Sequence, residues 1–189
     1  MTADRLNAFT DGVLAIVITI MVLELHVPSG EGFEAIKPAL PLLGAYALSF
    51  VNIGIFWNNH HHMMRTARRI DGRVLWANLF LLFWLSLVPF VIRWIGEAGI
   101  SAPPAAAYGT VLIMASLAYL LLERALIAAE GEGSKVKTAV GSRTKEWLSF
   151  AIYGLGVLAA FLSPWLSVAL YVAVSLMWLI PDRRFEGVA

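Results

Sequence analysis

Charged residues divide the chain into long apolar stretches. Five stretches contain no Asp, Glu, Lys or Arg, and they cover residues 12–23, 38–64, 74–92, 98–122 and 147–181. A helix that spans a membrane needs about 20 mainly apolar residues, with a range of about 17–25. The second, third and fourth stretches each fit one such helix. The pattern therefore predicts several membrane-spanning helices.

The first and last stretches need a different interpretation. The last would extend roughly 52 Å as one helix, although the hydrocarbon core is only about 30 Å thick. Ser163-Pro164 near its middle predicts a turn between two short helices, because proline lacks the N–H that continues a helix. The first stretch reaches spanning length only if its helix includes Asp11 and extends back towards Arg5. We therefore expect six helices, over residues 5–26, 38–64, 74–95, 104–128, 146–162 and 165–181.

The lysine and arginine residues test this count independently, because cytoplasmic loops carry an excess of them. With six spans, Lys37 and Arg93 fall on one side and the other twelve on the opposite side. This asymmetry predicts that both termini lie in the cytoplasm. If residues 147–181 formed one tilted helix, only Arg183 and Arg184 would change sides. The twelve are Arg5, Arg65, Arg68, Arg69, Arg73, Arg124, Lys135, Lys137, Arg143, Lys145, Arg183 and Arg184.

The composition is that of a membrane protein. Of 189 residues, 59% are hydrophobic and 14% are charged, whereas a soluble domain carries about 25% charged residues. The net charge of +1 gives no basic excess for binding nucleic acid, and the lack of cysteine excludes disulfides and thiolate chemistry. We expect residues 1–189 to form one all-α transmembrane domain, with a polar linker at 129–145 on the cytoplasmic side.

The N-terminal segment is interpreted as a retained first helix. Asp11 interrupts its apolar run, and no small-residue cleavage site follows, so the segment does not have the pattern of a signal peptide. A charge at this depth is expensive in lipid and must face protein or water. Donors on the second and third helices are the expected partners of Asp11.

Three adjacent histidines, His60, His61 and His62, raise the question of a metal site. Successive helical residues point about 100° apart, so these side chains cannot converge on one ion. No cysteine or carboxylate stands near them, and we expect hydrogen bonding instead of metal binding. The chain also contains no G-x-S-x-G, H-E-x-x-H or P-loop sequence, so we expect no enzyme and no cofactor.

The first helix carries a stripe of residues at i, i+4 and i+7 spacing. One interpretation is a face that packs against lipid or another helix. The alternative is a pore-lining face, where rings of branched aliphatic side chains gate by dewetting. The stripe by itself leaves both open. Its members are Gly12, Ile16, Thr19, Ile20, Leu23 and Val27.

The first three expected helices contain specific motifs. Residues 5–11 form an R-x-x-x-F-[S/T]-D pattern with Thr10 at the hydroxyl position. This pattern resembles the signature of the transmembrane protein 175 family of potassium channels, in which serine is usual at that position. The last three helices match the family only in general character. The other matching motifs are Ser49-Phe50 with Trp57-x-x-His60-His61 in the second helix, and Asn78-Leu79 followed by Pro89-Phe90 in the third.

This resemblance implies a prokaryotic single-repeat channel in the plasma membrane. Such relatives assemble as homotetramers around a pore lined by the first helix, and they conduct K⁺ in preference to Na⁺ without a T-V-G-Y-G filter. The constriction would be formed by Ile16, Ile20 and Leu23, with Thr19 as a pore-facing hydroxyl. The expected partners are K⁺, the bilayer and further copies of the chain. The resemblance also implies a structural network of Arg5, Phe9, Thr10, Asp11, Trp57, His60, His61 and Asn78.

Two alternatives from other classes remain. A small proton-coupled secondary transporter would use Asp11 and His60–His62 as a proton relay. Transporters often contain inverted repeats and broken helices, but no repeat is evident and the clear break is at Ser163-Pro164. A membrane enzyme acting on lipid would need a nucleophile or metal set that the sequence does not offer.

Overall fold

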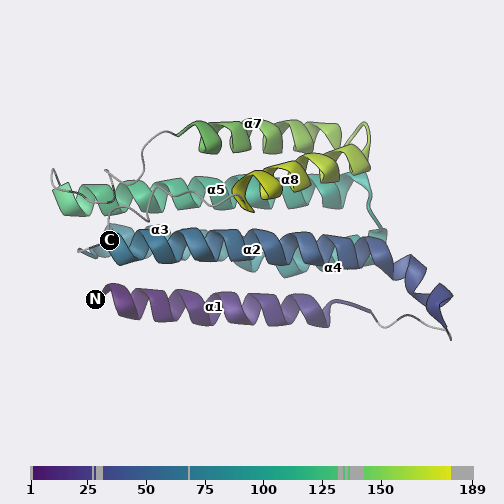
Figure 1. Cartoon of the computed structure of the whole chain (residues 1–189), viewed down its shortest axis with the longest axis horizontal. Coiled ribbons are helices and arrows are strands. Elements are labelled where there is room, and N and C mark those ends of the chain that lie inside the picture. Colours follow the sequence, from purple (N-terminus) through teal and green to yellow (C-terminus); the bar gives the residue numbers. More distant parts are fainter. Residues whose placement is uncertain are drawn as a thin grey trace.

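The computed structural model of the chain is a bundle of long helices that lie side by side (Figure 1). It describes residues 2–26, 28, 32–67, 69–131, 134, 136 and 143–179. Val27, residues 180–181 and most of the expected linker at 129–145 lie outside the described residues. The elements are α1 (Ala3–Leu23), the 3₁₀ helix η1 (Phe33–Ala39), α2 (Leu40–Thr66), α3 (Gly72–Ser86), α4 (Val88–Ala98), α5 (Ala102–Glu130), α7 (Thr144–Ala159) and α8 (Pro164–Leu179).

The structure divides the expected helix over residues 74–95 into two. α3 ends at Ser86, α4 begins at Val88, and the N–H of Leu87 bonds to the carbonyl of Trp84, three residues back, at 3.2 Å. Pro89 explains the break, because it has no N–H to give to the preceding turn and its ring crowds that turn. The other described helix ends lie within a few residues of the expected positions.

Four segments among the described residues are long and apolar enough to cross a membrane. α7 and α8 have 16 residues each and would extend about 24 Å, less than the hydrocarbon core of about 30 Å. The expected turn between them at Ser163-Pro164 is confirmed, since α7 ends at Ala159 and α8 begins at Pro164. The four long segments are Ala3–Leu23, Phe33–Thr66, Gly72–Ala98 and Ala102–Glu130.

The described cations are divided between the two ends of the bundle. One end of the bundle holds the starts of α1, α3 and α7 and the ends of α2 and α5 (Figure 1). Lys37 and Arg93 belong to η1 and α4 at the opposite end. We call the end where α1 begins the cation-rich end. Its described cations are Arg5, Arg65, Arg69, Arg73, Arg124, Arg143 and Lys145.

α5 lies at the centre of the bundle and α1 lies at its edge. α5 packs against α3, α4, α7 and α8, whereas α1 packs against α2, α3 and α4 (Figure 1). The helices are joined by a continuous apolar core that includes Met21, Ile53, Leu81 and Leu112, each at most 1% exposed. The scaffold is therefore centred on α5, and α1 is added to one side of it.

Tyr171 of α8 fixes the close packing of α5, α7 and α8. Its side chain is fully buried, and its hydroxyl donates to the carbonyl of Ala105 at 3.1 Å. The ring lies directly against Gly109 of α5 and Gly156 of α7, where a methyl group would overlap it. Two glycines thus provide the space for one buried tyrosine.

The first prediction concerns Gly109. We expect Gly109→Ala to lower the free energy of unfolding by about 1–3 kcal/mol, because the new methyl group must displace Tyr171 and Val157. Gly154→Ala is the matched control, since its methyl group would enter open space on α7. Thermal unfolding of the detergent-solubilised protein measures both. Equal melting temperatures for the two variants would contradict the packing argument.

Candidate functional site

α1 has two faces with opposite surroundings. The buried residues of α1 recur every three or four positions, which places them along the side of the helix that faces the bundle. Their side chains are at most 4% exposed. Thr10 is the polar member among four apolar residues, so its hydroxyl must find a partner inside the bundle. The buried residues are Leu6, Thr10, Leu14, Val17 and Met21.

The opposite face is the stripe predicted from the sequence. Ile16 is 59% exposed, Ile20 is 41% exposed and Leu23 is 80% exposed. Gly12 and Thr19 are also exposed, and α1 lies at the edge of the bundle (Figure 1). The helices of one chain therefore leave this aliphatic face uncovered.

Thr19 places a polar atom within that uncovered face. Its Oγ1 donates to the carbonyl of Ile16 at 2.9 Å, within the same helix. A hydroxyl that bonds back to its own helix keeps its acceptor lone pairs for an outside group. The face thus presents an oxygen acceptor one residue before Ile20, between two branched aliphatic side chains.

A buried chain of hydrogen bonds ties α1 to α3 and α2. Asn78 of α3 donates from Nδ2 to Thr10 Oγ1 at 3.0 Å, and its Oδ1 lies 2.8 Å from Nε2 of His60 on α2. Since the amide oxygen accepts, His60 carries a proton on Nε2 in this arrangement. All three side chains are at most 2% exposed. Asn78 therefore bridges two helices through both ends of its amide.

The residue after Thr10 makes a second link to α2. Nε1 of Trp57 donates to Asp11 Oδ1 at 2.8 Å, and the Trp57 ring stacks on His61 with centroids 5.9 Å apart. A hydrogen bond to a carboxylate is about twice as strong as one between neutral groups. Adjacent residues of α1 are thus held by two different helices, which defines the rotation of α1 about its own axis.

The predicted network is only partly brought together. Thr10, Asp11, Trp57, His60 and Asn78 are linked by hydrogen bonds, and His61 joins them through its ring contact. Arg5 and Phe9 lie outside this set: both are exposed, Phe9 by 49%. Thr2 caps the helix by accepting from the backbone N–H of Arg5 at 3.4 Å.

A second buried polar cluster was missed by the sequence analysis. Asn52 of α2 donates from Nδ2 to the hydroxyl of Tyr108 at 3.3 Å and accepts from Ser175 Oγ at 3.0 Å. Ser49 Oγ lies 3.0 Å from the same tyrosine oxygen. The tyrosines in the later helices could have indicated this cluster, because a buried tyrosine hydroxyl usually needs a hydrogen-bond partner. This cluster joins α2 to α5 and α8.

The comparisons with known proteins identify the family. Residues 5–89 match the family described as endosomal/lysosomal potassium channel TMEM175. A potassium channel from Chryseobacterium sp. (strain P1-3) is 50% identical over 186 residues, which cover 98% of this chain and 97% of that protein. The chain belongs to the TMEM175 family. The resemblance stated from the motifs is thereby confirmed, and so is the expectation that the protein is an ion channel and not an enzyme.

Two further TMEM175 matches come from Chamaesiphon minutus. A potassium channel of that organism is 30% identical over 176 residues, covering 87% of each protein. The crystal structure of a lysosomal potassium-selective channel TMEM175 homolog from Chamaesiphon minutus superposes with a TM-score of 0.75 at 25% identity. The superposition covers 94% of this chain and 96% of that one, so the similarity extends over nearly the whole chain.

The second prediction concerns Asn78. We expect Asn78→Ala to lower the free energy of unfolding by about 1–3 kcal/mol, because it leaves the Thr10 hydroxyl and a His60 ring nitrogen buried and unpaired. Ser86→Ala on the same helix is the matched control, since its exposed hydroxyl bonds only to the carbonyl of Phe83 among the contacts described. Chemical unfolding in detergent compares the two. A loss no larger for Asn78→Ala than for Ser86→Ala would contradict the bridging role.

Proposed function

We propose that four copies of this chain form a potassium channel with α1 of each copy around the central pore. The observation that carries this proposal is the uncovered aliphatic face of α1, which presents Ile16, Ile20 and Leu23. The names of the bacterial relatives, which are potassium channels, support the choice of K⁺.

The proposed constriction selects by the cost of dehydration. Four copies of Ile16, followed by rings of Ile20 and Leu23, narrow the path with side chains that cannot replace water around an ion. K⁺ gives up its water more readily than Na⁺, which favours K⁺ without a cage of carbonyl groups. Thr19 adds a ring of acceptor oxygens between the aliphatic rings. When the side chains within a ring approach one another, water leaves the path and ions no longer pass.

The proposed membrane arrangement follows the charges. The cation-rich end faces the cytoplasm of the cell whose plasma membrane holds the channel. α7 and α8 then complete six crossings, with the bilayer thinning locally to accommodate their shorter length. Because α1 begins and α8 ends towards the cation-rich end, both termini are cytoplasmic in this arrangement (Figure 1).

The hydrogen bonds on α1 would determine where its aliphatic face points. Thr10 and Asp11 bond to α3 and α2 from one side of α1, so Ile16 is held towards the opposite side. The alternative of a proton-coupled transporter would require Asp11 and His60 to exchange protons. Their bonds to Trp57 and Asn78 support a positioning role instead. Single-channel openings under voltage would separate the two hypotheses, because a carrier gives none.

The third prediction concerns Ile16. We expect Ile16→Asn to increase K⁺ flux into proteoliposomes and to lower the K⁺/Na⁺ ratio severalfold, because polar side chains keep the constriction wet. Val22→Asn is the matched control: it makes the same kind of change at a 46% exposed position about 120° around α1. Unchanged flux and an unchanged ratio for Ile16→Asn would remove Ile16 from the constriction.

The fourth prediction tests the position of α1 in the assembly. Because the chain contains no cysteine, single-cysteine variants report on one site each. We expect Leu23→Cys to form disulfide-linked dimers on mild oxidation, because the Leu23 side chains of different copies meet near the axis. Leu162→Cys, at a position 87% exposed between α7 and α8, should stay monomeric on denaturing gels. Crosslinking of Leu162→Cys without crosslinking of Leu23→Cys would place α1 away from the axis.

A further inference from the structure

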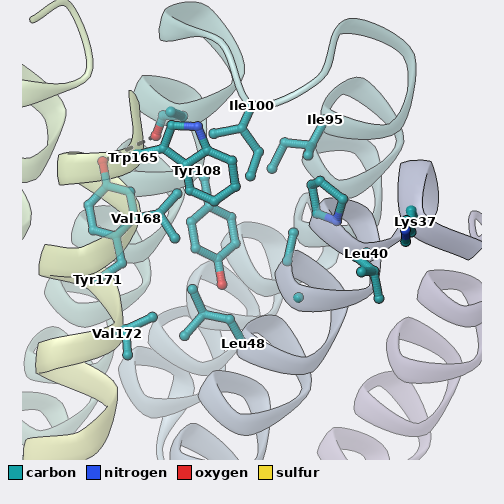
Figure 2. Close-up of a pocket in the computed structure, with 14 residues that line it drawn as sticks. Lys37, Leu40, Leu48, Ile95, Ile100, Tyr108, Trp165, Val168, Tyr171 and Val172 are labelled. Carbon is teal, nitrogen blue, oxygen red and sulfur yellow. Dashed lines mark hydrogen bonds between the residues drawn. The ribbon is translucent and has the colours of Figure 1, made fainter. Parts of the chain in front are cut away.

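An apolar cavity opens at the end of the bundle opposite the cation-rich end. It has a volume of about 510 Å³ and lies between α2, the start of α5 and α8. Figure 2 shows Leu48, Val168 and Val172 around its inner part, with Trp165 across the top and Lys37 at one side. None of these side chains belongs to α1, so the cavity is separate from the proposed pore.

The walls of the cavity leave its occupant no hydrogen-bonding group at depth. Tyr108 and Tyr171 line it, but the Tyr108 hydroxyl bonds to Ser49 and Asn52, and the Tyr171 hydroxyl bonds to the carbonyl of Ala105. Both tyrosines therefore present ring carbon to the cavity. A ligand with polar groups would lose its water here without replacement, so the inner part suits a hydrocarbon.

The depth of the cavity corresponds to one leaflet of a bilayer. From Leu40 near the rim to Leu48 at the inner end, α2 rises about 12 Å. Half of a hydrocarbon core about 30 Å thick is about 15 Å. A cavity of this depth is long enough to hold most of the acyl chain of one leaflet.

A more polar hollow adjoins the apolar cavity at its rim. It has a volume of about 550 Å³, is lined in part by His26, Gly96 and Gly99, and shares Ile100 and Trp165 with the apolar cavity. Trp165 is 59% exposed, as interfacial tryptophans are. An apolar slot that continues into a polar hollow matches an amphiphilic molecule.

Lys37 supplies a cation at one side of the apolar cavity. It lines the apolar cavity, its side chain is 65% exposed, and it pairs with Glu34 one turn earlier, whose side chain is 81% exposed. An exposed ion pair of this kind is weak, so an incoming phosphate can compete for the ammonium group. Figure 2 places Lys37 beside Leu40, at the side of the cavity away from α8.

We infer that this cavity binds a phospholipid, with one acyl chain in the apolar part and its phosphate beside Lys37. The inference requires the chain to be embedded in a membrane, but it does not depend on α1 lining a pore. The occupant is a membrane lipid because the slot has leaflet depth, hydrocarbon walls and a cation at its outer end.

Native mass spectrometry of the detergent-solubilised protein, titrated with phosphatidylglycerol, tests the inference. Gly44 lines the cavity and a methyl group built on it meets open space, so Gly44→Leu fills the slot without disturbing α2. We expect the affinity for phosphatidylglycerol to fall about tenfold, the loss when about two methylene groups stay unburied. Gly154→Leu on α7, also in open space, is the matched control and should bind like the unaltered protein.

Three results would overturn the inference. The first is an unaltered protein that retains no phosphatidylglycerol, and the second is equal binding by Gly44→Leu and Gly154→Leu. The third is loss of the oligomer in the spectra of Gly44→Leu, which would mean that another copy of the chain covers the cavity. Melting temperatures measured alongside establish that both variants are folded.

The headgroup part has its own test. Lys37→Gln should weaken phosphatidylglycerol binding severalfold, because the phosphate loses its cation. Arg93→Gln removes the other described cation at this end of the bundle and should leave binding unchanged, since Arg93 does not line the apolar cavity. Equal binding by the two variants would overturn the assignment of the phosphate to Lys37.

Discussion

The hydrogen bonds between α1 and its two neighbours are the constraint on which the functional argument depends. Helices in a bilayer gain little from the hydrophobic effect, because lipid tails are as apolar as leucine, so close packing and polar pairs must hold them. α1 lies at the edge of the bundle and needs such pairs more than the central α5 does. Asn78 and Trp57 provide them through consecutive residues, Thr10 and Asp11. Because these residues point about 100° apart, the two bonds define the rotation of α1 as well as its position.

The rotation of α1 decides which side chains face outward. With Thr10 directed at Asn78, Ile16 lies on the uncovered side. A turn of α1 by one residue's angle would carry Thr10 away from Asn78 and bring part of the aliphatic face against the core. The first change leaves the Thr10 hydroxyl without its partner, and the second disturbs the packing of the core. Each would lower the free energy of unfolding. The polar network therefore determines where the aliphatic face points, and this requires no contact between the two.

The sequence predicted the features that depend on local patterns. Charge-free stretches predicted the helices, Ser163-Pro164 predicted the turn before α8, and the 3.6-residue period predicted that the stripe residues share one face of α1. The break at Leu87 was missed because membrane helices often tolerate proline when neighbours satisfy the freed carbonyl, so Pro89 alone was not decisive. The Asn52 cluster was missed for another reason. Its members are 56 and 123 residues apart, and their contact depends on how α5 and α8 dock against α2.

α2 connects the two halves of the bundle, because it carries members of both polar clusters. Asn52 bonds to α5 and α8, whereas Trp57 and His60 bond to α1 and α3 less than three turns further along the same helix. Bending α2 between these two places would strain one set of hydrogen bonds or the other. The apolar cavity shares Tyr108 with the Asn52 cluster. The apolar cavity and the contacts that hold α1 are therefore connected through one helix, α2.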